Sequence, residues 1–207
     1  MLKIDDYTHT DMLSLSGTVS SACLDTILIG LGNPIMGDDG VGWRVVQEIK
    51  TRLAEKPLPL SQALIESRLA IETLCLGGLS LMEHLVGYRR AVLVDAVETG
   101  QHEPGVLLNF SLDEIPDIYG SHLASAHDTS LQTAVTLGKS LGLPLPEEIL
   151  VVGIEIQVSY EFSESLSPAV AAAIPGAANS VIDLLDAQFA ATNPNPYQST
   201  LAEQGKH

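Results

Sequence analysis

Four polar residues stand where apolar runs of the sequence end. Asp38 and Asp39 lie in a loop after the first apolar run, and Asp95 interrupts the most apolar run of the chain. His127 lies in a polar loop that precedes a helix-like stretch. In an open α/β sheet, ligands bind at the carboxyl ends of the strands. Two carboxylates and one imidazole would make a three-ligand site with one open position, which suits Zn²⁺ or Ni²⁺.

Each candidate also has a purely structural interpretation. An ionised Asp95 in an apolar run is costly unless it is paired or binds a metal, but a hydrogen-bonded aspartate could equally tie two loops together. Asp38 and Asp39 could cap the helix that follows them. We favour capping for Asp38 alone, since one carboxylate normally suffices. A lone histidine in a loop usually has no special function. His127 is a candidate ligand only because Asp128-Thr129 resembles a helix start.

The glycine-rich loop at 30–42, GLGNPIMGDDGVG, matches neither common phosphate-binding motif. A dinucleotide fingerprint needs glycine where Ile35 stands, and no Gly-Lys-Ser/Thr ends the loop. Adjacent carboxylates in the loop would also repel phosphate. A nucleotide-binding domain therefore remains an alternative that the loop argues against. No His-Glu-x-x-His motif of a zinc peptidase is present.

The composition indicates a globular protein with a strongly acidic charge. Of the 207 residues, 45% are hydrophobic and 17% charged, and the formal net charge is −16. Such a charge disfavours nucleic acid and anionic membrane surfaces as partners, although it can simply provide solubility. We expect no secretory signal, no membrane span and a cytoplasmic location. Cys23 and Cys75 suggest no disulfide framework, and we expect Cys75 to be a buried, reduced thiol.

Short apolar runs alternate with amphipathic stretches along the chain. Strands are predicted at 26–30, 69–74, 90–97, 105–112 and 150–157. Helices are predicted at 41–53, 79–86, 131–141 and 166–191, the last with a break at Pro175-Gly176. This alternation predicts an α/β three-layer sandwich, with a mostly parallel sheet of about five strands and helices on both faces. We expect one domain at 25–191, an N-terminal extension at 1–24 and a flexible tail at 192–207.

Several motifs, in order along the chain, resemble those of the hydrogenase maturation endopeptidases. The first is the loop at 30–44, GLGNPIMGDDGVGWR, which has that family's glycines, asparagine and acidic pair. Asp95-Ala96 at a strand end, His127 before a helix and the late strand motif Val152–Glu155 follow. One departure is Cys75–Leu79, where the family often has Asp-Gly-Gly-Thr. The resemblance identifies 25–191 as the maturation protease domain.

The resemblance implies a hydrolase, a metal-dependent endopeptidase. Its substrate would be the nickel-loaded large-subunit precursor of a [NiFe]-hydrogenase, from which it removes a C-terminal extension as the last step of maturation. Carried over residue by residue, the catalytic and metal-binding residues would be Asp39, Asp95 and His127. The nickel would come with the substrate, and a surrogate divalent metal could take its place in vitro.

Two further alternatives stay open. A non-catalytic nickel or large-subunit chaperone would use the same three residues and cut nothing. A generic metallopeptidase would instead hold its metal tightly in the purified protein.

Overall fold

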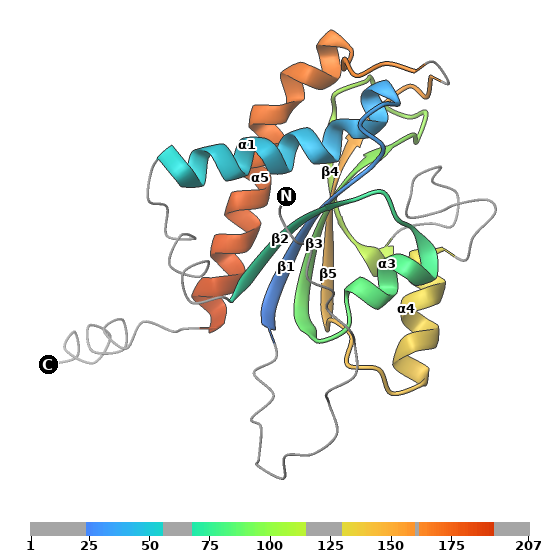
Figure 1. The fold of residues 1–207 in the computed structure, drawn as a ribbon, viewed down its shortest axis with the longest axis vertical. Helices are drawn as coiled ribbons and strands as arrows, with labels where there is room; N and C mark the ends of the chain where they lie inside the picture. Colours follow the sequence, from blue (N-terminus) through green and yellow to red (C-terminus); the bar gives the residue numbers. More distant parts are fainter. Residues whose placement is uncertain (1–23, 56–67, 115–129, 160–161, 193–207) are drawn as a thin grey trace, which may run out of the picture.

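A computed structural model of the chain describes residues 24–55, 68–114, 130–159 and 162–192 (Figure 1). Its centre is one five-stranded sheet in the order β2-β1-β3-β5-β4. The strands are β1 (Leu24–Leu31), β2 (Leu69–Leu74), β3 (Tyr88–Val97), β4 (Leu107–Ser111) and β5 (Glu148–Glu155). All neighbouring pairs are parallel except β4 with β5, so the predicted mostly parallel sheet is confirmed.

Helices cover both faces of the sheet and make the predicted three layers (Figure 1). On one face lie α1 (Val41–Glu55) and α5 (Pro168–Thr192), and on the other lie α3 (Gly78–His84) and α4 (Leu131–Ser140). Two short 3₁₀ helices, η1 (Gly37–Gly40) and η2 (Leu112–Glu114), flank β1 and β4.

The apolar runs are continuous because the central strands are buried on both faces. Along β1, Leu28 belongs to the core under α1 and α5, whereas Ile27 and Ile29 belong to the core under α3 and α4. The same alternation occurs in β3, where Val92 and Leu93 face opposite cores.

The amphipathic spacing placed the helices correctly. Val41, Val45 and Ile49 recur every fourth residue in α1 and are all fully buried. Ser130 caps α4, since its side chain accepts a hydrogen bond from the Thr133 amide. Nearly all of the predicted N-terminal extension and C-terminal tail, at 1–23 and 193–207, lies outside the described residues.

The predicted break at Pro175-Gly176 is wrong, because α5 runs without interruption from Pro168 to Thr192. A proline inside a helix loses one main-chain hydrogen bond. Val170, Ala177 and Val181 anchor the helix in the core on both sides of that position, which outweighs the loss.

Among the described residues, the segment Pro168–Ala187 of α5 is long and apolar enough to cross a membrane by length and composition. By length and composition alone, this helix runs against the expectation that the chain has no membrane span. Such a segment is weak support for a span, since core helices of soluble proteins pass the same test. Here 28% of the window is buried, including Ala178 and Leu185, which are fully buried in the core.

Candidate functional site

The site lies at the carboxyl ends of β1 and β3, where the order of the strands reverses. From β1 the chain goes outward to β2, and then returns to the other side of β1 as β3. The connection after β1 leads to α1 on one face of the sheet, and the connection after β2 leads to α3 on the other. A reversal of this kind opens a crevice between the loops. The loop after β1 carries Asp38 and Asp39, and the end of β3 carries Asp95.

Glycine at position 42 lets the start of α1 sit directly against the sheet. A Cβ atom on Gly42 would lie 2.4 Å from the carbonyl oxygens of both Leu31 and Val94. Gly30 packs equally closely against the start of α1, since a Cβ atom added to Gly30 would lie 2.4 Å from the Gly42 carbonyl oxygen. This close approach fixes the height of η1, and hence of Asp39, above the sheet edge.

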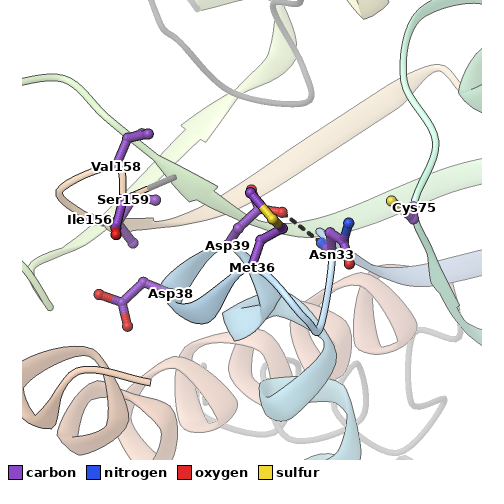
Figure 2. Close-up of a pocket in the computed structure, with 8 residues that line it drawn as sticks. All are labelled: Asn33, Met36, Asp38, Asp39, Cys75, Ile156, Val158 and Ser159. Atoms are coloured by element: carbon purple, nitrogen blue, oxygen red, sulfur yellow. Dashed lines mark hydrogen bonds between the residues drawn. The ribbon is translucent and has the colours of Figure 1, made fainter. Parts of the chain in front are cut away.

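Asp39 faces a cavity of about 330 Å³ (Figure 2). Its Oδ2 accepts a hydrogen bond of 2.6 Å from the main-chain N–H of Asn33, so the carboxylate is oriented by its own loop. The Asn33 side-chain oxygen accepts from the Ile35 amide at 3.2 Å, which stabilises the turn. Figure 2 shows Met36 and Asn33 beside Asp39, between Cys75 on one side and Ile156, Val158 and Ser159 on the other.

Asp38 points away from Asp39 in Figure 2. Its Oδ1 accepts a hydrogen bond of 2.6 Å from the amide of Ser167, the residue just before α5. No side-chain cap is made at the start of η1. The prediction that Asp38 caps its own helix is therefore wrong: the carboxylate binds an amide at the start of another helix, 129 residues further along the chain.

Asp95 is fully buried, with 0% of its surface exposed, in a stretch of β3 that is otherwise apolar. It pairs in register with Gly153 of β5. The structure thus brings Asp39 and Asp95 to the same sheet edge, but Asp39 lines the cavity and Asp95 does not. His127, the third predicted ligand, lies outside the described residues. Among the residues that are described, no three His, Cys, Asp or Glu side chains form a metal-binding group.

Cys75 is exposed, so its predicted burial is wrong. The cysteine comes directly after β2 and lines the cavity that Asp39 faces (Figure 2). Partial desolvation raises the pKa of the Cys75 thiol above its ordinary value, and the negative charge of Asp39 raises it further. The thiol is therefore protonated and weakly nucleophilic at neutral pH.

We expect iodoacetamide to alkylate Cys75 more slowly at pH 8 than it alkylates an unperturbed thiol. The rate should rise as the pH rises through the elevated pKa, because only the thiolate reacts. Asp39→Asn should accelerate the reaction and Asp38→Asn should not, since Asp38 does not contribute to the shift. Peptide mass mapping separates Cys75 from Cys23, and a Cys75 rate above that of the free thiol would contradict this account.

Two carboxylates that sequence reasoning left unassigned hold the loops around the site. Glu155, 1% exposed at the end of β5, accepts hydrogen bonds from the amides of Thr99 and Gly100, each at 2.9 Å, and from the Thr99 hydroxyl at 2.8 Å. Glu98 accepts a hydrogen bond of 3.1 Å from the Val158 amide. For Glu155 the signal in the sequence was an acidic residue at the end of a buried strand.

A Gly-x-Ser-x-Gly string occurs at 138–142, but the structure gives it no nucleophilic role. That motif activates serine only on a sharp turn from a strand into a helix. Here Ser140 is the last residue of α4, and its hydroxyl donates to the Leu137 carbonyl.

A second cavity, of about 650 Å³, adjoins the first. Asp38, Val158 and Ser159 line both. The second cavity extends along the start of α5, past Ser167 and Pro168.

Comparison with known proteins points to one family. The hydrogenase maturation protease family model matches residues 43–184, more than half of the 207 residues. That range includes Asp95 and His127 but begins after Asp39.

Two known proteins illustrate the similarity in sequence. The chain is 24% identical over 159 residues to the hydrogenase expression/formation protein HoxM of Cupriavidus necator, over 77% of this chain and 73% of that protein. It is 25% identical over 159 residues to the hydrogenase 2 maturation protease of Escherichia coli, over 77% of this chain and 89% of that one.

A solved structure shows the same fold. The hydrogenase maturating endopeptidase HybD from E. coli aligns with a TM-score of 0.60 at 19% identity, and the alignment covers 78% of this chain and 92% of that chain.

Proposed function

Because this chain belongs to the hydrogenase maturation protease family, we propose that it removes the C-terminal extension of a nickel-loaded [NiFe]-hydrogenase large-subunit precursor. The chain is accordingly a protease, and this cleavage is the last step of large-subunit maturation. The proposal places the reaction in the cytoplasm and involves neither nucleic acid nor a membrane.

The observation that carries the proposal is the position of Asp39. Its carboxylate lines a cavity at the strand-order reversal, where α/β sheets bind their ligands, and the Asn33 amide holds it in place. Asp95 lies near the end of the neighbouring strand at the same edge. Two carboxylates, one from η1 and one from β3, are the kind of donors that engage a divalent metal.

In this proposal the nickel belongs to the substrate. Asp39, Asp95 and His127 would engage the ion that the precursor already holds, so that only a metal-loaded precursor is recognised. A divalent ion next to the scissile bond would polarise its carbonyl or lower the pKa of a bound water. Because Asp95 is buried in the free protein, its access to the ion requires the site to open when the precursor binds.

A non-catalytic assembly chaperone would use the same residues, so it is the competing function. The two differ only in whether the precursor is cut. The family match favours the protease, because the family is described by its proteolytic activity.

The test is incubation of the purified protein with a cognate large-subunit precursor, with the intact mass of the precursor as the readout. We expect the mass to fall by that of the C-terminal extension, and only when this protein is present. A folded protein that binds the precursor without changing its mass would establish the chaperone instead.

A further inference from the structure

The segment Ile156–Ser159, which follows β5, forms a shared wall of the two adjoining cavities. Ile156, Val158 and Ser159 line the first cavity, and Gln157, Val158 and Ser159 line the second. Because the two cavities share three lining residues, together they form one groove that runs from Asp39 toward the start of α5, with this segment along its side. Volumes of about 330 and 650 Å³ have the size that small ligands and short peptide segments occupy.

The last residue of β3 and the residue after it hold this wall. The Ile156 amide donates to the Val97 carbonyl at 2.8 Å, which continues the pairing of β5 with β3 by one residue. Two residues further on, the Val158 amide donates to Oε1 of Glu98 at 3.1 Å. Where the main-chain pairing of β5 with β3 ends, the Glu98 side chain provides the next hydrogen bond. It binds Val158, which lines both cavities.

Glu98 is itself held from the opposite strand. Glu155 binds the amides of Thr99 and Gly100, the two residues after Glu98. The two contacts are therefore reciprocal. Glu155 of β5 fixes the loop after β3, and Glu98 of that loop fixes the segment after β5. Glu98 lines neither cavity, so its contact with the groove is the hydrogen bond to Val158 and not a direct contact with a bound chain.

We propose that Glu98 is a positioning residue for substrate binding, because its hydrogen bond to Val158 holds the wall of the groove that receives the peptide chain around the scissile bond. This inference rests on the proposed proteolytic function. Asp39 is oriented independently by Asn33, so loosening the wall should weaken binding and leave the chemical step intact. The expected signature is a change in KM with little change in kcat.

The test compares Glu98→Ala, Glu98→Gln and Glu103→Ala in the precursor-processing assay. Glutamine keeps an oxygen that can accept from Val158, whereas alanine removes it. Glu103 is an exposed glutamate in the same loop, so its replacement removes the same charge without touching Val158. We expect Glu98→Ala to raise KM roughly tenfold, the effect of losing one hydrogen bond to a charged acceptor. Glu98→Gln and Glu103→Ala should stay near the wild-type KM.

Amide exchange measured by NMR gives a second readout that does not depend on cleavage. The Val158 amide should exchange faster in Glu98→Ala than in the wild type, and Glu98→Gln should restore its protection. The inference is overturned if Val158 loses protection while KM stays unchanged, or if kcat falls instead of KM. It is also overturned if Glu98→Gln is as impaired as Glu98→Ala. If the wild-type protein cleaves no precursor, the proposed function itself fails, and the exchange data then still report on the hydrogen bond.

Discussion

Replacing Asp39 by asparagine is expected to slow precursor processing roughly a thousandfold or more and to leave the unfolding transition close to that of the wild type. A divalent metal that polarises the scissile carbonyl contributes several kcal/mol to transition-state stabilisation, which is lost when a residue that engages the metal is removed. About 1.4 kcal/mol corresponds to a factor of ten in rate. The asparagine side chain still carries an oxygen that can accept from the Asn33 amide, so the loop should keep its shape. His127→Ala should produce a comparable loss if His127 completes the ligand set.

The matched control is Asp38→Asn, the same change at the neighbouring residue. Asp38 contacts the Ser167 amide and points away from Asp39, and asparagine can keep that contact. Because Asp38 also lines the groove, we expect kcat to stay near the wild-type value and any loss to appear in KM. Full activity in Asp39→Asn, or equal losses in the two variants, would show that Asp39 has no special place in the reaction. Rates from the intact-mass assay, together with thermal melts, decide between these outcomes.

Replacing Gly42 by alanine is expected to destabilise the protein by about 3 kcal/mol or more. The added Cβ would lie 2.4 Å from two main-chain carbonyl oxygens, one on β1 and one on β3, and neither can move without disturbing the centre of the sheet. The start of α1 must then shift outward and carry η1 and Asp39 with it. Processing should therefore fall even under conditions where the variant is still folded.

Gly176→Ala is the control for the general effect of replacing a glycine in a helix by alanine, without a clash against the sheet. Gly176 lies inside α5, and its Cβ would meet only the Leu107 side chain, at 3.4 Å. Alanine is the better helix former, so this variant should be as stable as the wild type or slightly more so. Urea unfolding curves with unchanged m values give the difference in free energy of unfolding. A Gly42→Ala variant as stable as Gly176→Ala would refute the close packing of α1 on the sheet.

The layered fold could be read from the sequence because it follows from local patterns. Predominantly apolar runs of five to eight residues indicate strands covered on both faces, and four-residue spacing in α1 indicates one buried helix face. The order of these elements then placed Asp39 and Asp95 at the same edge of a parallel sheet. No distance between the two residues was needed for that inference, only the rule that parallel strands end together.

The errors concern contacts between distant parts of the chain. Asp38 binds Ser167, and the contacts of α5 with the core carry the helix through Pro175. Cys75 is exposed, although its flanking residues are apolar, because β2 ends just before it and the chain turns along the rim of the cavity. None of these outcomes follows from neighbouring residues, since each depends on which segment the fold brings alongside.

The groove wall was missed for a related reason. Glu98 and Glu155 look like ordinary acidic residues at strand ends, and only the pairing of β3 with β5 brings each next to the amides it binds. Glu155 could have been suspected, because a glutamate that ends a buried strand needs partners. Nothing near Glu98 in the sequence indicates Val158.

The central claim is that this protein cuts only a precursor that already carries its nickel. The most direct measurement is the intact mass of a cognate large-subunit precursor, nickel-loaded in one sample and nickel-free in the other, after incubation with the purified protein. The account predicts loss of the C-terminal extension from the nickel-loaded precursor alone. Equal cleavage of both precursors would contradict the role given to the metal, and cleavage of neither by the folded protein would contradict the proteolytic function.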